Sequence, residues 1–174
     1  MAETQTGVRV ELSPHGEANA ATGLPVLDHL VGLFATTARL RIALEVSPGN
    51  AAEEVAAAGR ALGEALAAPL RSGAASGRGW ATLPADEALA TASLEIAETP
   101  LVVSNADFSG QLVGGLESDV VARFLNELAA GAGLNVHVRV LEGRDPEHVL
   151  AAIFKALGAA VGQACRPPHG GEVE

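Results

Sequence analysis

The stretch LNVHVRVLEGRDPEHVLAAIFKAL, residues 134–157, contains the pattern of a complete strand, turn and helix. Its first seven residues alternate between apolar and polar side chains, a period of two that predicts a half-buried strand with His137 on the polar face. Asp145 is the expected N-cap, and Pro146 occupies the first helical position, where its missing N–H costs nothing. A helix is predicted from this proline onward, with an apolar stripe at helical spacing on its buried face.

The same pattern occurs once more, earlier in the chain. Leu40 lies 94 positions before Leu134, and Gly63 lies 95 positions before Gly158, so the second copy has gained one residue. Two copies at this long period indicate two similar half-domains rather than a solenoid. We place the first half-domain at about 1–79, the second at about 80–165 and a frayed, acidic tail at 166–174.

The remaining elements follow from alternation and helical spacing. Residues 13–24 are expected to form a loop, and the glycine- and serine-rich segment 71–79 a flexible boundary between the halves. Each half then holds a sheet and two helices, which predicts an α+β fold with the helices on one face of a mostly antiparallel sheet. Strands are expected at 8–12, 40–46, 88–96, 101–104, 134–140 and around Phe108, and helices at 26–36, 51–68, 118–130 and from 146.

Composition describes a chain able to bury a core, with 48% hydrophobic and 18% charged residues. No apolar run reaches the roughly 18 residues that span a bilayer, and no signal peptide is recognisable, so a soluble, cytoplasmic protein is predicted. The one cysteine, Cys165, has no partner in the chain, which fits a reducing compartment.

The charge balance argues against two classes of partner. The net charge is −10, Lys155 is the only lysine, and the arginines are scattered along the sequence without a cluster. A nucleic-acid surface needs a basic patch, usually with aromatic side chains that stack on bases, and aromatics are only 3% of this chain. Nucleic acids and anionic membranes are therefore not expected partners.

Three histidines lie in or beside regular elements, next to a carboxylate or a turn: His29, His137 and His148. A metal site built on imidazole needs several convergent ligands. These histidines, with Glu53 and Glu147, would form such a site only if the fold brings them together, and otherwise they are structural or solvated residues.

Five segments follow one another along the chain: TGLPVLDHL (22–30), GRALGEAL (59–66), LPADEALA (83–90), AGLNVHVRV (132–140) and IFKAL (153–157). In their order and spacing, across nearly the whole chain, they resemble the imidazoleglycerol-phosphate dehydratase family. The resemblance implies a duplicated half-domain of the ribosomal protein S5 domain 2-like type, in agreement with the repeat. It also implies a trimer or a 24-subunit assembly, two manganese ions at subunit interfaces, and dehydration of imidazole glycerol phosphate in histidine biosynthesis.

The family's eight metal ligands are a His in its L-D-H segment, a His in the strand of the second repeat, and an H-H-x-x-E motif in each half. His29, His137 and His148 match three of these positions. Glu53 and Glu147 stand where two histidines would be, but their charge and reach argue against the two-manganese geometry. The other three positions hold alanine, at Ala52, Ala56 and Ala151.

Other functional positions of the family have changed as well. Gln5 stands where the family has a glutamate, and an amide cannot act as a base. Thr91 and Thr99 stand where the family has phosphate-contacting arginines, so the charge-assisted contact to phosphate is lost. The family's basic tail is replaced by PHGGE, which lacks the lysine. Metal, base and phosphate contacts are thus all affected.

Within the matching segments, Asp86, Glu87 and Lys155 are the substrate-binding residues that the resemblance implies. Three hypotheses remain open. The first is a divergent, catalytically impaired or inactive homologue that keeps the fold and an assembly role, as a homo-oligomer or together with a complete paralogue. The second is a single-metal protein or a lyase with altered chemistry, and the third is an active dehydratase.

Overall fold

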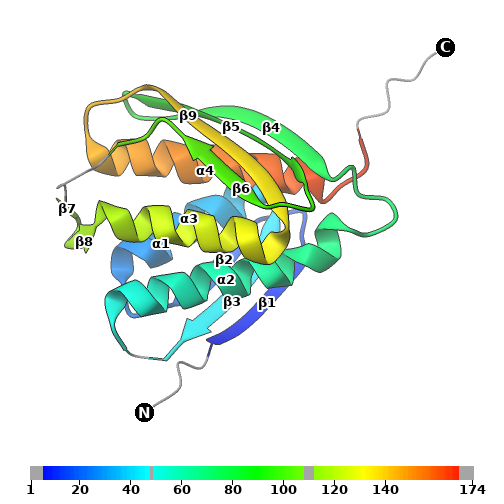
Figure 1. The fold of residues 1–174 in the computed structure, drawn as a ribbon, viewed down its shortest axis with the longest axis horizontal. Coiled ribbons are helices and arrows are strands. Elements are labelled where there is room, and N and C mark those ends of the chain that lie inside the picture. Colours follow the sequence, from blue (N-terminus) through cyan, green and yellow to red (C-terminus); the bar gives the residue numbers. More distant parts are fainter. Residues whose placement is uncertain (1–5, 48, 108–111, 169–174) are drawn as a thin grey trace.

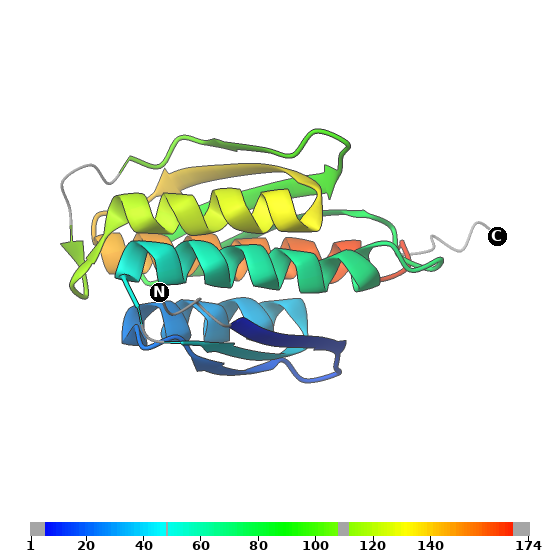
Figure 2. The same ribbon diagram turned by 60° about the horizontal axis from the view of Figure 1, so that its bottom comes forward.

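The computed structural model describes residues 6–47, 49–107 and 112–168, and its elements form four layers in the order sheet, helices, helices, sheet (Figures 1 and 2). The predicted strand around Phe108 lies outside the described residues. The first half consists of β1 (Thr6–Leu12), β2 (Glu17–Ala21), α1 (Pro25–Ala38), β3 (Leu40–Val46) and α2 (Ala51–Leu70). The second half consists of β4 (Arg78–Ala85), β5 (Ala88–Ile96), β6 (Leu101–Ser104), β7 (Leu112–Val113), β8 (Leu116–Glu117), α3 (Ser118–Ala132), β9 (Leu134–Glu142) and α4 (Pro146–Ala164).

The two sheets repeat one topology. In the first sheet β3 is central, antiparallel to β1 and parallel to β2. In the second sheet β9 takes the same place, antiparallel to β5 and parallel to β6, and β4 extends the sheet by pairing with β5. Helices α1 and α2 cover one face of the first sheet, and α3 and α4 cover one face of the second (Figure 2). The predicted duplicated α+β fold is confirmed.

The local signals in the sequence explain where the main elements begin. Along β3 every second residue is buried, as its alternation predicted. Helix α4 starts at the predicted N-cap, because the carboxylate of Asp145 accepts a hydrogen bond from the backbone N–H of Glu147 at 2.8 Å. Asn50 caps α2 in the same way, with 2.9 Å between its Oδ1 and the N–H of Ala52.

Two strands differ from the sequence prediction. β2 lies in the segment predicted to be a loop, because alanine-rich EANAA carries little strand propensity and pairs with β3 only through the tertiary fold. β4 begins inside the predicted flexible boundary and runs through Pro84. A proline is tolerated there because β4 is an edge strand, where one side of the backbone needs no partner in the sheet.

Arg166 was predicted to begin the frayed tail, but in the structure its side chain is held by hydrogen bonds. Its Nη1 donates to the carbonyls of Ala38 and Gly162, at 2.9 and 2.8 Å, and its Nη2 donates to the carbonyl of Arg39 at 2.7 Å. The guanidinium therefore satisfies carbonyls at the ends of α1 and α4. Within the described ranges, no helix is long and apolar enough to cross a membrane.

The two halves meet helix to helix, with α1 beside α4 and α2 beside α3 (Figure 1). The backbones approach so closely that a Cβ added at Gly63 would lie 2.3 Å from the carbonyl oxygen of Leu128, and one added at Gly158 would lie 2.3 Å from that of Phe34. Phe34 and Leu128 are 94 positions apart, so the two contacts are related by the repeat. We call this pair of contacts the glycine seam.

Replacing a seam glycine by alanine should separate the two helix layers. Gly63→Ala and Gly158→Ala are each expected to lower the free energy of unfolding by about 1–3 kcal/mol, the usual cost of overpacking. Gly32→Ala is the matched control in α1, because a Cβ there meets no atom within 4 Å. Helix propensity alone should make that variant more stable, by about 0.5–1 kcal/mol. Urea unfolding measures all three, and seam variants as stable as the control would disprove the seam.

Candidate metal and substrate site

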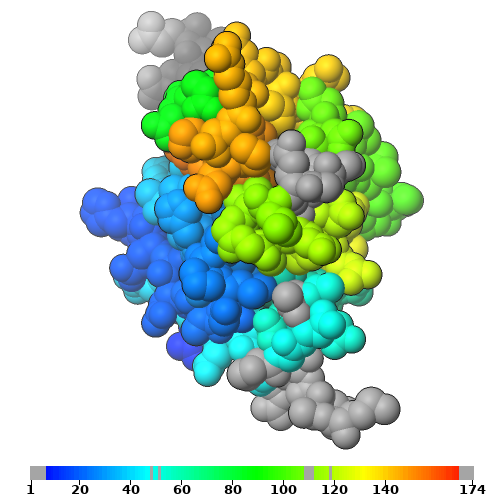
Figure 3. All heavy atoms as spheres, turned by 90° about the vertical axis from the view of Figure 1, so that its left-hand side faces the viewer, coloured from blue at the N-terminus to red at the C-terminus, as the bar shows by residue number. Residues whose placement is uncertain are grey.

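The first turns of all four helices lie at one end of the molecule, the face shown in Figure 3. Each helix has an acidic residue in its first turn, where a negative charge interacts favourably with the positive end of the helix dipole. Exposed Glu53 and Glu147 are members of this set, so their positions have a structural explanation that needs no metal. The set comprises Asp28, Glu53, Glu54, Asp119 and Glu147.

At this end, the start of α4 is bound to the turn between β4 and β5. The Nδ1 atom of His148 lies 2.6 Å from Oε2 of Glu87, and its Nε2 atom lies 3.4 Å from Oδ2 of Asp86. The other oxygen of Glu87 accepts hydrogen bonds from the backbone N–H groups of Arg144 and Asp145, at 3.2 and 2.9 Å. Glu87 thus holds both the imidazole and the turn that precedes the helix.

The protonation of this pair follows from its hydrogen bonds. The pKa of Glu87 falls from an ordinary 4.5 to about 2, mainly because the N–H of Asp145 and then the ring of His148 stabilise the carboxylate. The pKa of His148 is raised above its ordinary 6.5, first by the hydrogen bond to Glu87. The hydrogen bond to Glu87 therefore favours the charged imidazolium over the neutral ring.

Lys155 belongs to the same region. Its Nζ donates to the backbone carbonyl of Pro84 at 2.6 Å, next to the turn that carries Asp86 and Glu87. The predicted substrate-binding residues Asp86, Glu87 and Lys155 therefore lie around one hairpin, together with His148. Their pairing could not be read from the sequence, because the hairpin and α4 are far apart along the chain.

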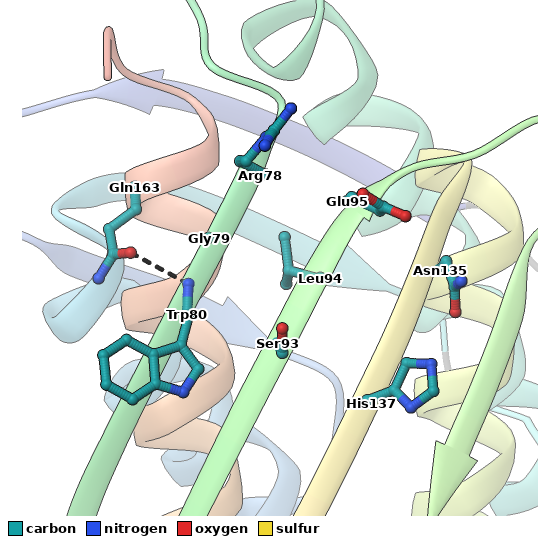
Figure 4. Close-up of a pocket in the computed structure, with 9 residues that line it drawn as sticks. All are labelled: Arg78, Gly79, Trp80, Ser93, Leu94, Glu95, Asn135, His137 and Gln163. Atoms are coloured by element: carbon teal, nitrogen blue, oxygen red, sulfur yellow. Dashed lines mark hydrogen bonds between the residues drawn. The ribbon is translucent and has the colours of Figure 1, made fainter. Parts of the chain in front are cut away.

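The remaining predicted metal ligands do not join this cluster within one chain. His29 is exposed in the first turn of α1. His137 is exposed on the outer face of β9, in an open pocket of about 460 Å³ that Trp80 and Ser93 also line (Figure 4). Among residues 6–47, 49–107 and 112–168, no group of three or more His, Cys, Asp or Glu side chains could hold a metal ion.

The two helix motifs contain fewer donor side chains than the H-H-x-x-E pattern of the family. Ala52, Ala56 and Ala151 offer only methyl groups. His148 is the exception, because Glu87 orients its ring through Nδ1, as in many metal-binding histidines. Its Nε2 lies 3.4 Å from Oδ2 of Asp86 and would have to lose its proton before binding an ion. A single oriented imidazole falls short of the several oxygen and nitrogen donors that manganese prefers.

Of the positions where the family has its base and its phosphate contacts, the structure describes Thr91 and Thr99. Gln5 and the PHGGE tail from His169 onward lie outside the described residues. The hydroxyl of Thr91 donates to the carbonyl of Ala81 at 3.1 Å and accepts from the hydroxyl of Thr82 at 3.0 Å, so it is used within the sheet. Thr99 is exposed between β5 and β6.

The fold alone defines a class, since two dehydratase crystal structures share it. Imidazoleglycerol-phosphate dehydratase from Pyrococcus furiosus, in complex with (S)-C348, superposes with a TM-score of 0.84 at 24% identity, covering 99% of this chain and 94% of that one. The Staphylococcus aureus enzyme gives a TM-score of 0.83 at 24% identity, covering 95% and 99%. The protein is thus a duplicated α+β protein with the dehydratase fold.

Sequence comparison takes the assignment further. The family model of imidazoleglycerol-phosphate dehydratase matches residues 22–161. The Methanothermobacter thermautotrophicus dehydratase is 34% identical over 175 residues, covering 97% of this chain and 88% of that protein. The Ruminiclostridium cellulolyticum dehydratase is 32% identical over 168 residues, covering 94% and 87%. The chain belongs to the imidazoleglycerol-phosphate dehydratase family, as its motifs predicted.

The Glu87–His148 pair should be visible in the titration of His148. Glu87→Gln is expected to lower the pKa of His148, because the largest cause of its raised value is removed. Glu147→Gln removes a charge from the same helix turn that does not contact the ring, and it should leave that pKa unchanged. Proton NMR of the imidazole across pH 5–9 measures both variants, and equal titration of the two would contradict the pairing.

The same pair fixes the direction of two stability changes. Because the pKa of His148 is raised in the folded protein, its contribution to the free energy of unfolding is complete below the ordinary pKa of about 6.5. This contribution is lost as the pH rises through the raised pKa of the folded state. Because the pKa of Glu87 is lowered in the folded protein, its contribution to the free energy of unfolding is present above about pH 4.5. This contribution is lost as the pH falls toward about 2.

Proposed function

We propose that this chain is a catalytically impaired or inactive member of the dehydratase family that keeps the fold and an assembly role. The observation that carries the proposal is the loss of donors at both helix motifs, where three ligand positions hold alanine. Removing ligands from a metal site weakens binding far more than it weakens the fold, because the packing of the halves does not pass through those side chains.

The charges around the cluster support the same conclusion. Two exposed carboxylates, Asp86 and Glu87, compensate the positive charge of His148 at the hairpin. The carboxylate of Glu87 also accepts hydrogen bonds from backbone N–H groups. Lys155 is bound to a backbone carbonyl, and Thr91 offers a hydroxyl where the family has an arginine. A phosphorylated substrate would therefore lack the guanidinium contact that the family supplies at the position of Thr91.

An assembly role is supported by what the chain has kept. The chain superposes on the Pyrococcus furiosus dehydratase with a TM-score of 0.84, so the body of the molecule has the shape of that relative. We expect a homo-oligomer, or an assembly with a complete copy of the family. Co-expression with such a copy, followed by tagged purification and mass determination, distinguishes mixed from separate assemblies.

The proposal predicts no dehydration of imidazole glycerol phosphate above background, with or without manganese. Loss of an electrophilic clamp and of a positioned base each commonly costs a factor of about 10² to 10⁴. The assay uses a complete dehydratase as the positive control, and elemental analysis after manganese dialysis should find well under two ions per chain. The relatives are named as dehydratases, which fits an active enzyme equally well. Complementation of a strain that lacks its dehydratase therefore decides between an active and an inactive protein. Growth without histidine would disprove the proposal.

A single-metal protein is the second candidate, and the orientation of His148 by Glu87 is the observation that favours it. If a bound ion uses this imidazole, manganese should raise the melting temperature, and His148→Asn should abolish the rise. Under the leading proposal the melting temperature does not respond, and Glu53→Ala and Glu147→Ala each cost at most about 1 kcal/mol through the helix dipole. His29→Asn serves as the comparison for an exposed histidine outside the cluster.

A further inference from the structure

Three arginines from distant parts of the sequence line one pocket of about 450 Å³. Arg39 follows α1, Arg78 begins β4, and Arg166 follows α4. Because Arg39 and Arg166 line it, the pocket lies where α1 and α4 end. These helix ends are at the opposite end of the molecule from the helix first turns (Figure 1). A gathering of positive charge is unexpected in a chain whose net charge is −10.

The positive charge of this arginine pocket is not compensated by carboxylates. Its lining includes no Asp or Glu among the described residues. Arg41 and Arg60 do form ion pairs with glutamates, whereas in the described part of the chain Arg39 and Arg78 form none. Glu95 lies opposite Arg78 on β5 without pairing with it (Figure 4). Two guanidinium groups thus remain available to an anion.

Arg166 has a different role from the other two. Its N–H groups are occupied by the carbonyls at the ends of α1 and α4. Burial, and then the nearby charge of Arg39, lowers its pKa, which indicates that the two guanidiniums share one environment. Arg166 already places a positive charge at the C-terminal ends of α1 and α4, where a cation interacts favourably with the helix dipole. Arg39 and Arg78 are therefore not required for that purpose.

The backbone of Arg39 gives an independent indication. Arg39 caps α1 in the left-handed region, with φ of 52°, which is unfavourable for a residue with a Cβ. Its counterpart in the second half, 94 positions later, is Gly133, which caps α3 with φ of 71°. An arginine at a position where the repeat has glycine lowers the local stability of the backbone. Residues in such unfavourable backbone conformations are enriched at functional sites.

We propose that the arginine pocket binds a small molecule that carries a phosphate group. Guanidinium groups match the phosphate oxygens in geometry and charge, and Arg39 and Arg78 supply two of them. Ser76 and Gln163 add polar lining, while Pro167 and Pro168 form an apolar wall for the rest of the ligand. The volume is that of a small-molecule site. This inference does not depend on whether the chain dehydrates its family's substrate.

Calorimetric titration of the full-length protein in about 0.1 M salt, where distant charges are screened, tests the proposal. The probes are inorganic phosphate and glycerol phosphate, and no metal is added. Arg39→Gly and Arg78→Gln are each expected to weaken binding by about ten- to hundredfold, the effect of losing a hydrogen bond to a charged group. Arg123→Gln removes the same charge from the exposed side of α3, and it should change affinity by less than about twofold because Arg123 does not line the pocket.

Arg39→Gly also separates binding from folding. Because glycine suits the left-handed position, this variant should have a higher urea midpoint than the parent while binding phosphate more weakly. Glu95→Gln, which removes the neighbouring negative charge, should tighten binding. The proposal is overturned if phosphate does not saturate the protein below about 10 mM, if the pocket variants bind like Arg123→Gln, or if succinate binds as tightly as glycerol phosphate.

Discussion

Close contact between the backbones of the two helix layers is the constraint on which this structure depends. At Gly63 and Gly158 a helix from one half lies against the carbonyl groups of a helix from the other, with no room for a methyl group. The buried rings of Phe124 and Phe154, whose centroids are 5.7 Å apart, fill the space between α3 and α4. Since each helix layer also carries its own sheet, the seam sets the position of every other element.

The seam also explains the electrical asymmetry of the molecule. With α1 beside α4 and α2 beside α3 in parallel, the four helix dipoles add, and their positive ends share one face (Figure 3). Acidic residues gather at that face, and arginines gather where α1 and α4 end. The first arrangement weakens the case for Glu53 and Glu147 as ligands. The gathering of arginines provides more positive charge than the capping of α1 and α4 requires, and the surplus lies on Arg39 and Arg78.

Sequence patterns predicted the parts of the fold that local physics determines. Alternation located β3, β5 and β9, and the N-cap at Asp145 located α4, because each signal lies within a few residues of its effect. β2 and the anchoring of Arg166 were missed, because both depend on partners supplied only by the folded chain. For the same reason the site residues could be named one by one, while the contact of Glu87 with His148 and the gathering of three arginines could not be predicted.

The glycine seam has a consequence for how the two halves can differ. Its paired contacts have the geometry of an isologous dimer interface, in which the same patch is used twice. In a true homodimer a substitution appears on both sides of the symmetry axis, so any cost is incurred twice. Here one polypeptide holds both sides, so Arg39 can occupy a position that stays glycine at Gly133. Covalent joining thus lets the molecule keep a symmetric interior while carrying an asymmetric surface.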